Sequence, residues 1–254
     1  MAILDRPRRR RQRASFGAQT GGGPGVNTKA ARIIQAARTA GQTTLSEYDS
    51  KRVLKLYGVP TSKEVLVTSQ TAARTAASKI GYPVVLKACS ADATHKPELG
   101  LVAVGLGTAK ELLEAFRRIA KRAGPDYGGA WLVQEMVSGQ REVMIGMVRD
   151  AQFGPSVMFG LGGIFTEILQ DVSFRVAPVR KRDALDMMAA IRAHRILGPV
   201  RGMKPVDRHV MAQAIMALGR IGLDFPEISE IDVNPMIIRG SLPVAVDGLI
   251  VLGE

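Results

Sequence analysis

Residues 159–178 read FGLGGIFTEILQDVSFRVAP, with three glycines at positions 160, 162 and 163. We expect a strand at Ser156–Phe159 before this glycine cluster and another at Phe174–Ala177 after it. Glycine carries no side chain and tolerates unusual backbone angles, so such clusters mark places where a ligand approaches closely. The stretch therefore predicts two strands joined by a loop that approaches a ligand.

Outward from this stretch, helical and strand patterns are interleaved along most of the chain. Helices are predicted at residues 29–40, 46–57, 70–80, 108–122, 182–195 and 206–221, and further strands at residues 64–67, 84–88, 131–136, 142–148, 230–238 and 244–252. We interpret 131–136 with 142–148 as one antiparallel hairpin, and the last two strands as another across a turn at residues 239–241. Helices mixed with hairpin-joined strands favour an α+β fold in two lobes.

The domain boundaries follow from composition. Residues 1–27 combine six arginines in the first 13 positions with the run GGGPG, which predicts a disordered basic tail. An organelle transit sequence is the alternative to a solvated tail, and we assign the tail no function. Residues 28–254 form the folded domain, with one lobe made of about 45–68 and 155–254 and the other of 69–154. The tail supplies much of the net charge of +12, so nucleic acid is an unlikely partner.

Composition also limits the class of protein. The chain has 254 residues, of which 46% are apolar, enough to fill a core, and no uncharged stretch approaches the roughly 20 residues of a membrane span. A single cysteine, Cys89, fits a reducing compartment. We therefore expect a cytoplasmic protein that does not enter a membrane.

Two segments of the first half carry candidate binding residues. Lys87 follows the apolar run Val84–Leu86, so its side chain either reaches into a cleft, where it would contact phosphate, or extends to solvent. In the run Gln134, Glu135, Met136 and Val137, hinge backbone groups are candidates for an adenine edge and Glu135 for a ribose hydroxyl. Glu142 is either a further ligand contact or a solvated acid.

Acidic and amide side chains alternate near the C-terminus. Glu230, Asp232 and Asn234 lie on one face of a predicted strand, and Asp247 is expected on the partner strand. Such oxygen ligands suit Mg²⁺, which keeps water and nucleotide phosphates in its shell. The alternative is a solvent-facing strand. His95, in a polar loop after the Lys87 strand, is either a surface residue or a transient phosphoryl carrier.

Taken together, these segments resemble the nucleotide-binding subunit of ADP-forming acetate–CoA ligase and, more distantly, the β subunit of succinyl-CoA synthetase. The resemblance covers about residues 45–252. Its matching stretches are YPVVLK (82–87), THK (94–96), QEMV (134–137), FGLGGIFTE (159–167), DVSFRVAP (171–178), EIDVNP (230–235) and AVD (245–247).

The resemblance implies an ATP-grasp fold, in which two α+β lobes enclose the nucleotide. It assigns Lys87 to phosphate, the segment around Glu135 to adenine and ribose, and Asn234 and Asp247 to Mg²⁺. It places Asp232 near a phosphohistidine exchange site. The loop with Gly162 and Gly163 would cover the phosphates with backbone N–H groups. His95 matches the histidine proposed in this family to relay a phosphoryl group to ADP.

The implied activity is a reversible interconversion of acyl-CoA and acyl phosphate coupled to ATP/ADP, with Mg²⁺ as the metal. Because the sequence has no convincing CoA-binding half, a CoA-binding α-type partner is expected. Two alternatives remain open. One is a different ATP-grasp carboxylate ligase, which would not need His95, and the other is a non-catalytic nucleotide-binding or nucleic-acid-binding module.

Overall fold

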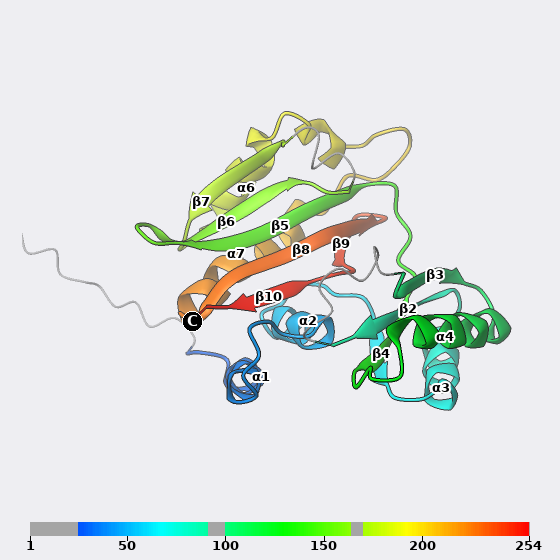
Figure 1. The fold of residues 1–254 in the computed structure, drawn as a ribbon. Coiled ribbons are helices and arrows are strands. Elements are labelled where there is room, and N and C mark those ends of the chain that lie inside the picture. The colour runs from blue at the N-terminus through cyan, green and yellow to red at the C-terminus, as the bar shows by residue number, and fades with distance from the viewer. Residues whose placement is uncertain (1–24, 91–99, 164–169, 254) are drawn as a thin grey trace, which may run out of the picture.

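The computed structural model describes residues 25–90, 100–163 and 170–253, and Figure 1 shows them as two sheets, each with its own helices. The first is a four-stranded antiparallel sheet in the order β1-β4-β2-β3. Helices α3 and α4 pack on one face of it. We call this unit the small lobe. Its elements are β1 (Glu64–Val67), α3 (Gln70–Ile80), β2 (Val84–Cys89), β3 (Val102–Leu106), α4 (Ala109–Ala123) and β4 (Ala130–Glu135).

The second sheet has six strands, in the order β10-β8-β5-β6-β7 with β9 paired to β8. Helices α6 and α7 pack against it, while α2 lies beside β10 and contacts α1. We call this unit the large lobe. Its helices are α1 (Thr28–Thr39), α2 (Glu47–Leu56), α6 (Lys181–Ala190), the 3₁₀ turn η1 (His194–Leu197) and α7 (Arg208–Asp224). Its strands are β5 (Glu142–Asp150), β6 (Gly154–Leu161), β7 (Val172–Val176), β8 (Ile228–Arg239), β9 (Leu242–Ala245) and β10 (Leu249–Leu252).

Local sequence explains why these helices form where they do. The hydroxyl of Thr108 accepts the N–H of Glu111 and begins α4, whose residues Leu112, Phe116 and Ile119 are buried at helical spacing. Ser46 begins α2 in the same way. No helix in the described part of the chain combines the length and apolar character needed to cross a membrane.

The structure corrects the predicted hairpin between residues 131–136 and 142–148. Strand β4 is paired on both sides, with β1 and with β2, so neither of its edges is left for β5. Strand β5 pairs instead with β6 and β8 in the other sheet. Residues 136–141 are therefore a crossover between the lobes. For the same reason β1 belongs with the small lobe and β5 with the large lobe, opposite to the lobe boundaries expected from sequence.

Three smaller differences concern one edge strand and the ends of two helices. Strand β3 was not predicted and completes the edge of the small sheet beside β2. The predicted tail extended to residue 27, but the side chain of Asn27 accepts the N–H groups of Lys29 and Ala30 and so begins α1. The rest of that tail, residues 1–24, lies outside the described residues. Helix α6 ends at Ala190 rather than near Arg195, and the buried Asp171 carboxylate accepts the N–H groups that follow, those of Arg192 and Ala193.

Candidate active site

One face of the small sheet presents polar side chains toward the large lobe. In strand β2, Val84, Leu86 and Ala88 belong to the small-lobe core, so the alternate residue Lys87 points to the opposite face. Gln134 of β4 pairs with Val85 of that face and with Glu64 of β1. Strand pairing therefore brings Lys87, Gln134 and Glu64 to one surface, although they are far apart in sequence.

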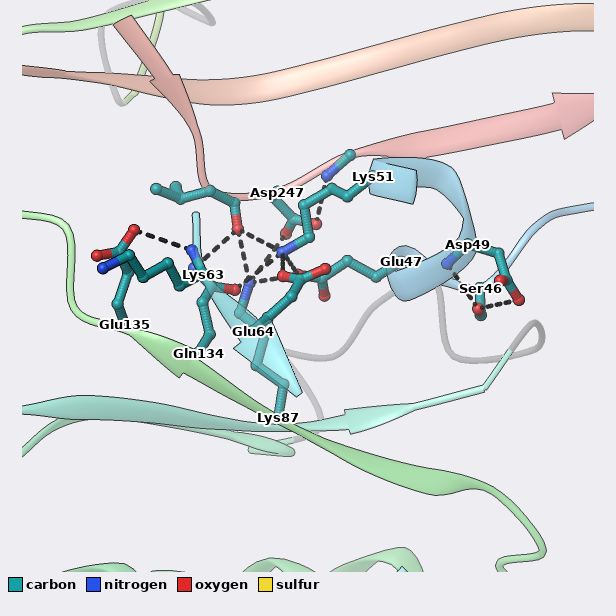
Figure 2. Close-up of polar contacts among 12 residues, drawn as sticks. Ser46, Glu47, Asp49, Lys51, Lys63, Glu64, Lys87, Gln134, Glu135 and Asp247 are labelled. Atoms are coloured by element: carbon teal, nitrogen blue, oxygen red, sulfur yellow. Dashed lines mark hydrogen bonds and ion pairs between the residues drawn. The ribbon is translucent and has the colours of Figure 1, made fainter. Parts of the chain in front are cut away.

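Lys87 is buried and reaches into the junction of the lobes, as Figure 2 shows. Its Nζ donates to Oε1 of Glu47 at 2.7 Å and to the carbonyl of Val246 at 3.1 Å, and lies 3.9 Å from Oδ2 of Asp247. Of the two orientations left open by the sequence, the structure has the one in which Lys87 faces the interior. It also brings the lysine next to Asp247, as the two-lobe hypothesis requires.

A second buried lysine, Lys51 of α2, was not singled out from the sequence. Its Nζ forms ion pairs with Glu47 at 2.9 Å and with Glu64, and donates to Oε1 of Gln134 at 3.0 Å. The signal in the sequence was Glu47 followed four residues later by Lys51, a spacing that places both on one side of a helix. That spacing is common on solvent-facing helices, so it did not indicate burial.

The end of β4 and the start of the crossover carry the four residues predicted to contact adenine and ribose. Gln134 and Val137 are buried, whereas Met136 is partly exposed. The N–H groups of Glu135 and Met136 donate to the carbonyls of Lys63 and Pro83 within the small lobe. The Glu135 carboxylate accepts the Lys63 N–H at 2.9 Å and an ion pair from Arg239 at 3.1 Å. A ribose contact from Glu135 stays a prediction, and the carboxylate has acceptor sites left for it beside these two partners.

The acidic residues of β8 lie where the alternation predicted. Ile231 and Val233 are in the large-lobe core, so Glu230, Asp232 and Asn234 occupy the opposite face of the strand. Asp247 is not on a strand, because it lies in the connection between β9 and β10.

Strand register nevertheless brings Asp247 to Asn234. Met236 pairs with Ala245 and Asp232 with Leu249, and continuing that register places Asp247 opposite Asn234. Burial, together with the nearby Glu230 and Asp247 carboxylates, raises the pKa of Asp232 to about 6. The charged form of this carboxylate is therefore less favourable than in water, and a nearby cation would stabilise it.

The glycine loop begins where β6 meets β5. Gly162 donates its N–H to the carbonyl of Glu142 at 3.0 Å, so that particular group serves the protein rather than a phosphate. A Cβ on Gly163 would lie 2.5 Å from Oε2 of Glu142, which places the Glu142 carboxylate against the loop. The rest of the loop, residues 164–169, and the predicted phosphoryl carrier His95 lie outside the described residues.

Arg141 is a further residue of the crossover that sequence reasoning missed. Its buried guanidinium donates to four backbone carbonyls, those of Ile196, Gly198, Lys204 and Gly240. It thereby fixes the start of β5, and with it Glu142, to the loops of the large lobe. No sequence pattern indicates that an arginine donates to distant backbone carbonyls, so this role could be recognised only in the structure.

Comparisons with known proteins agree with this architecture. The model of the ATP-grasp domain matches residues 36–252. The β subunit of ADP-forming acetate–CoA ligase I from Pyrococcus furiosus is 44% identical over 229 residues, which is 88% of this chain and 98% of that protein. ADP-forming acetate–CoA ligase I of Archaeoglobus fulgidus is 38% identical over 229 residues, 89% of this chain but 33% of that longer protein.

Among solved structures, dinucleotide-forming acetyl-coenzyme A synthetase 1 of Ca. Korarchaeum cryptofilum, in complex with coenzyme A, Ca-AMPCP and HgCl⁺, is similar with a TM-score of 0.84. The two chains are 38% identical, over 88% of this chain and 99% of that one. Another structure of the same protein contains Mg-AMPPCP and a phosphohistidine segment pointing towards its nucleotide-binding site, with a TM-score of 0.78. The chain belongs to the ATP-grasp family, in the group that includes the β subunits of ADP-forming acetate–CoA ligases.

Proposed function

We propose that this chain is the nucleotide-binding β-type subunit of an ADP-forming acyl-CoA synthetase. In this role it transfers a phosphoryl group between ATP/ADP and a phosphohistidine while a CoA-binding partner interconverts acyl-CoA and acyl phosphate. The observation that carries the proposal is the position of Lys87. Its side chain extends from an apolar strand of the small lobe to the connection between β9 and β10 in the large lobe. There its Nζ lies 3.9 Å from Oδ2 of Asp247. An ammonium and a carboxylate at a lobe junction suit a metal-bound phosphate chain.

The donor set formed by the middle of β8 and the connection between β9 and β10 fits Mg²⁺. Among the described residues, no group of three or more His, Cys, Asp or Glu side chains is arranged to hold a metal by itself. The amide of Asn234 and the carboxylate of Asp247 instead provide two hard oxygen ligands at adjacent register positions. Mg²⁺ is usually bound in this way, with water and phosphate oxygens as its other ligands. Burial and the neighbouring carboxylates raise the pKa of Asp232, and a divalent cation there would offset the repulsion among these carboxylates.

The residues of the chain have separable tasks in this proposal. Bound Mg²⁺ supplies charge neutralisation and orientation of the phosphates. Lys87 provides a compact cation for phosphate oxygens, and Asn234 and Asp247 hold the metal. The glycine loop is proposed to exclude water and His95 to carry the phosphoryl group, both from the family resemblance because they lie outside the described residues. Positioning and electrostatic stabilisation supply most of the rate.

A separate partner is supported by how the relatives are organised. The Pyrococcus furiosus relative is named a β subunit and is matched over nearly its whole length. In the Archaeoglobus fulgidus relative, the matching region is a third of a longer chain. We infer that the remaining two-thirds of that protein corresponds to functions that this chain obtains from an α-type subunit, including most of the CoA site.

Calorimetry and a thioester assay test the proposal together. The full chain is titrated with Mg-ADP alone, then co-purified with its α-type partner and assayed for ADP- and phosphate-dependent consumption of acyl-CoA. His95→Ala should abolish turnover while Mg-ADP affinity is retained. Lys87→Ala should weaken Mg-ADP binding by about tenfold or more, because a charge-assisted contact is worth about 1.5–3 kcal/mol. Absence of heat with adenine and guanine nucleotides contradicts the proposed function, and unchanged turnover in His95→Ala removes His95 from it.

A further inference from the structure

Four charged side chains, each no more than 9% exposed, form a cluster between the lobes, shown in Figure 2. Glu47 and Lys51 come from α2 of the large lobe, and Glu64 and Lys87 from β1 and β2 of the small lobe. We call these four residues the interface charge cluster. The formal charges of two lysines and two glutamates sum to zero, which is the condition under which buried ionic groups are tolerated. The proposed function uses only Lys87, so the other three residues need an explanation.

Lys51 cannot serve a ligand directly. Its Nζ has four acceptors: Oε1 of Glu47 at 2.9 Å, the Glu64 carboxylate, Oε1 of Gln134 at 3.0 Å and the Val246 carbonyl at 3.3 Å. An ammonium has only three protons to donate, and this side chain is 1% exposed. Burial would lower the pKa of Lys51, but Glu47 and Glu64 outweigh this effect and raise it, so the cation is permanent.

Among the described residues, the ammonium group of Lys87 has fewer hydrogen-bond partners than that of Lys51. Its Nζ donates to Oε1 of Glu47 and to the Val246 carbonyl, and the Asp247 carboxylate lies 3.9 Å away. Within the described part of the chain, hydrogen bonds therefore occupy two of its three protons. The same oxygen of Glu47 accepts from both lysines, at 2.9 Å from Lys51 and 2.7 Å from Lys87. Because that carboxylate is shared, Lys87 keeps part of its charge for an anion.

Lys51 also contacts the connection between β9 and β10, which carries Asp247. By accepting from Lys51, the Gln134 carbonyl oxygen turns the amide so that its Nε2 donates to the Val246 carbonyl at 3.1 Å. That carbonyl also receives hydrogen bonds from Lys51 and Lys87. Val246 directly precedes Asp247, so one ammonium helps to fix both the phosphate lysine and the expected metal ligand.

We propose that Lys51 is a positioning residue for nucleotide binding, which holds Glu47 and balances its charge so that Lys87 remains available to a nucleotide phosphate. The inference rests on the proposed function, because it requires Lys87 to bind phosphate. Without Lys51, two carboxylates would compete for one remaining cation of the cluster. Glu47, already 2.7 Å from Lys87, would then pair with it fully and withdraw it from the ligand.

Two double variants with the same net charge test this directly. Lys51→Met/Glu47→Gln and Lys51→Met/Glu64→Gln each remove one cation and one carboxylate, so each leaves one cation and one anion in the cluster. They differ only in which carboxylate remains. The measurements are the dissociation constant of Mg-ADP by calorimetry and the melting temperature of the full chain, with wild type and Lys87→Ala as references.

In Lys51→Met/Glu64→Gln, Glu47 should capture Lys87 and weaken Mg-ADP binding by about tenfold or more, approaching Lys87→Ala. In Lys51→Met/Glu47→Gln, the direct carboxylate partner of Lys87 is gone, and affinity should return to within about threefold of wild type. Lys51→Met/Glu64→Gln should bind Mg-ADP more weakly than Lys51→Met/Glu47→Gln even where the two variants have the same melting temperature. A purely structural role of Lys51 predicts that affinity follows stability in both variants.

The outcomes separate the inference from the function on which it rests. Wild type that binds Mg-ADP, together with equal affinities of the two double variants, overturns the positioning role and leaves the proposed function standing. Wild type that binds no nucleotide overturns the proposed function itself. If Lys51→Met alone fails to fold, the charge-balanced pair still decides the question, because each double variant avoids an uncompensated buried carboxylate.

Discussion

At Gly162 the backbones of β6 and β5 come so close that no side chain fits between them. A Cβ at this position would lie 2.8 Å from the carbonyl oxygen and 2.9 Å from the carbonyl carbon of Val143. The sequence predicted the glycine cluster as a place where a ligand approaches, and for the loop as a whole this stays a prediction. At Gly162, however, the approaching group is the protein's own strand, and the N–H donates to Glu142. The glycine holds the base of the loop in place.

Gly162→Ala should therefore destabilise the protein by about 1–3 kcal/mol, the usual cost of overpacking against an unyielding backbone. It should also weaken Mg-ADP binding, because the start of the loop moves away from β5. Gly128→Ala is the matched control, since a Cβ there meets nothing within 4 Å. Urea unfolding and calorimetry of both variants provide the check. Equal stability of Gly162→Ala and Gly128→Ala would refute the packing argument.

At the scale of elements, the sequence predicted nearly every helix and strand but assigned two of them to the wrong lobe. Alternating apolar residues predict that β4 and β5 are strands, and they say nothing about which strand each pairs with. Their connection, residues 136–141, is short enough for a hairpin and long enough for a crossover. The choice depends on non-local pairing, because β1 and β2 already occupy both edges of β4.

Some residues of the candidate site could also be identified from the sequence, and others could not. Lys87 and the alternating residues Asp232 and Asn234 could be identified because a polar side chain in an apolar strand is conspicuous. Lys51 and Arg141 could not, because the first lies on a helix with an ordinary ion-pair spacing and the second, among the described residues, donates to backbone carbonyls alone. Burial of these two side chains depends on segments more than 50 residues away along the chain.

Arg149 near the end of β5 stabilises another element, the C-terminus of α7. Its guanidinium donates to the carbonyl of Gly222 in the last turn of α7 at 2.6 Å, to that of the C-cap residue Phe225 at 3.0 Å and to that of Ile228, the first residue of β8, at 2.8 Å. Arg149→Ala should lower the free energy of unfolding by about 2 kcal/mol or more, because three carbonyls lose a charged donor. The unfolding free energy of Arg149→Lys should lie between those of wild type and Arg149→Ala, since an ammonium cannot reproduce the planar arrangement of guanidinium donors.

The control for Arg149 is Arg175→Ala on β7, where the exposed guanidinium donates only to the adjacent Phe174 carbonyl among the described residues. Its unfolding free energy should stay within about 0.5 kcal/mol of wild type. Chemical denaturation measures all three variants. Similar losses for Arg149→Ala and Arg175→Ala would mean that the end of α7 is held by packing rather than by these hydrogen bonds.

In the whole molecule, the two lobes have separate apolar cores joined by polar contacts. Ile145, Phe159 and Leu218 belong to the large-lobe core, and Leu86 and Phe116 to the small-lobe core. Between them lie the interface charge cluster, backbone hydrogen bonds such as that from Ser62 N–H to the Ala245 carbonyl, and the ion pair of Arg239 with Glu135. Buried ion pairs add little net stability because desolvation offsets their attraction. The junction therefore orients the lobes more strongly than it stabilises them.

The single tryptophan allows the coupling between the lobes to be measured. Trp131 lies in the small-lobe core, with its ring centroid 4.8 Å from that of Phe116 and 5.0 Å from that of Tyr127, so its fluorescence reports on that lobe. Far-UV circular dichroism reports on both. Because the small-lobe core is smaller and its junction is polar, the fluorescence transition in urea should precede the circular dichroism transition.

Mg-ADP should bring the two transitions together, since a ligand held as proposed, by Lys87 from one lobe and by Asn234 and Asp247 from the other, stabilises both lobes at once. At a concentration of about 100 times the dissociation constant, binding contributes about 2.7 kcal/mol. Mg²⁺ without nucleotide is the control and should leave the fluorescence midpoint nearly unchanged, because two protein oxygens alone bind the ion weakly. Coincident transitions in the absence of any ligand would show that the polar junction by itself makes the two lobes a single cooperative unit.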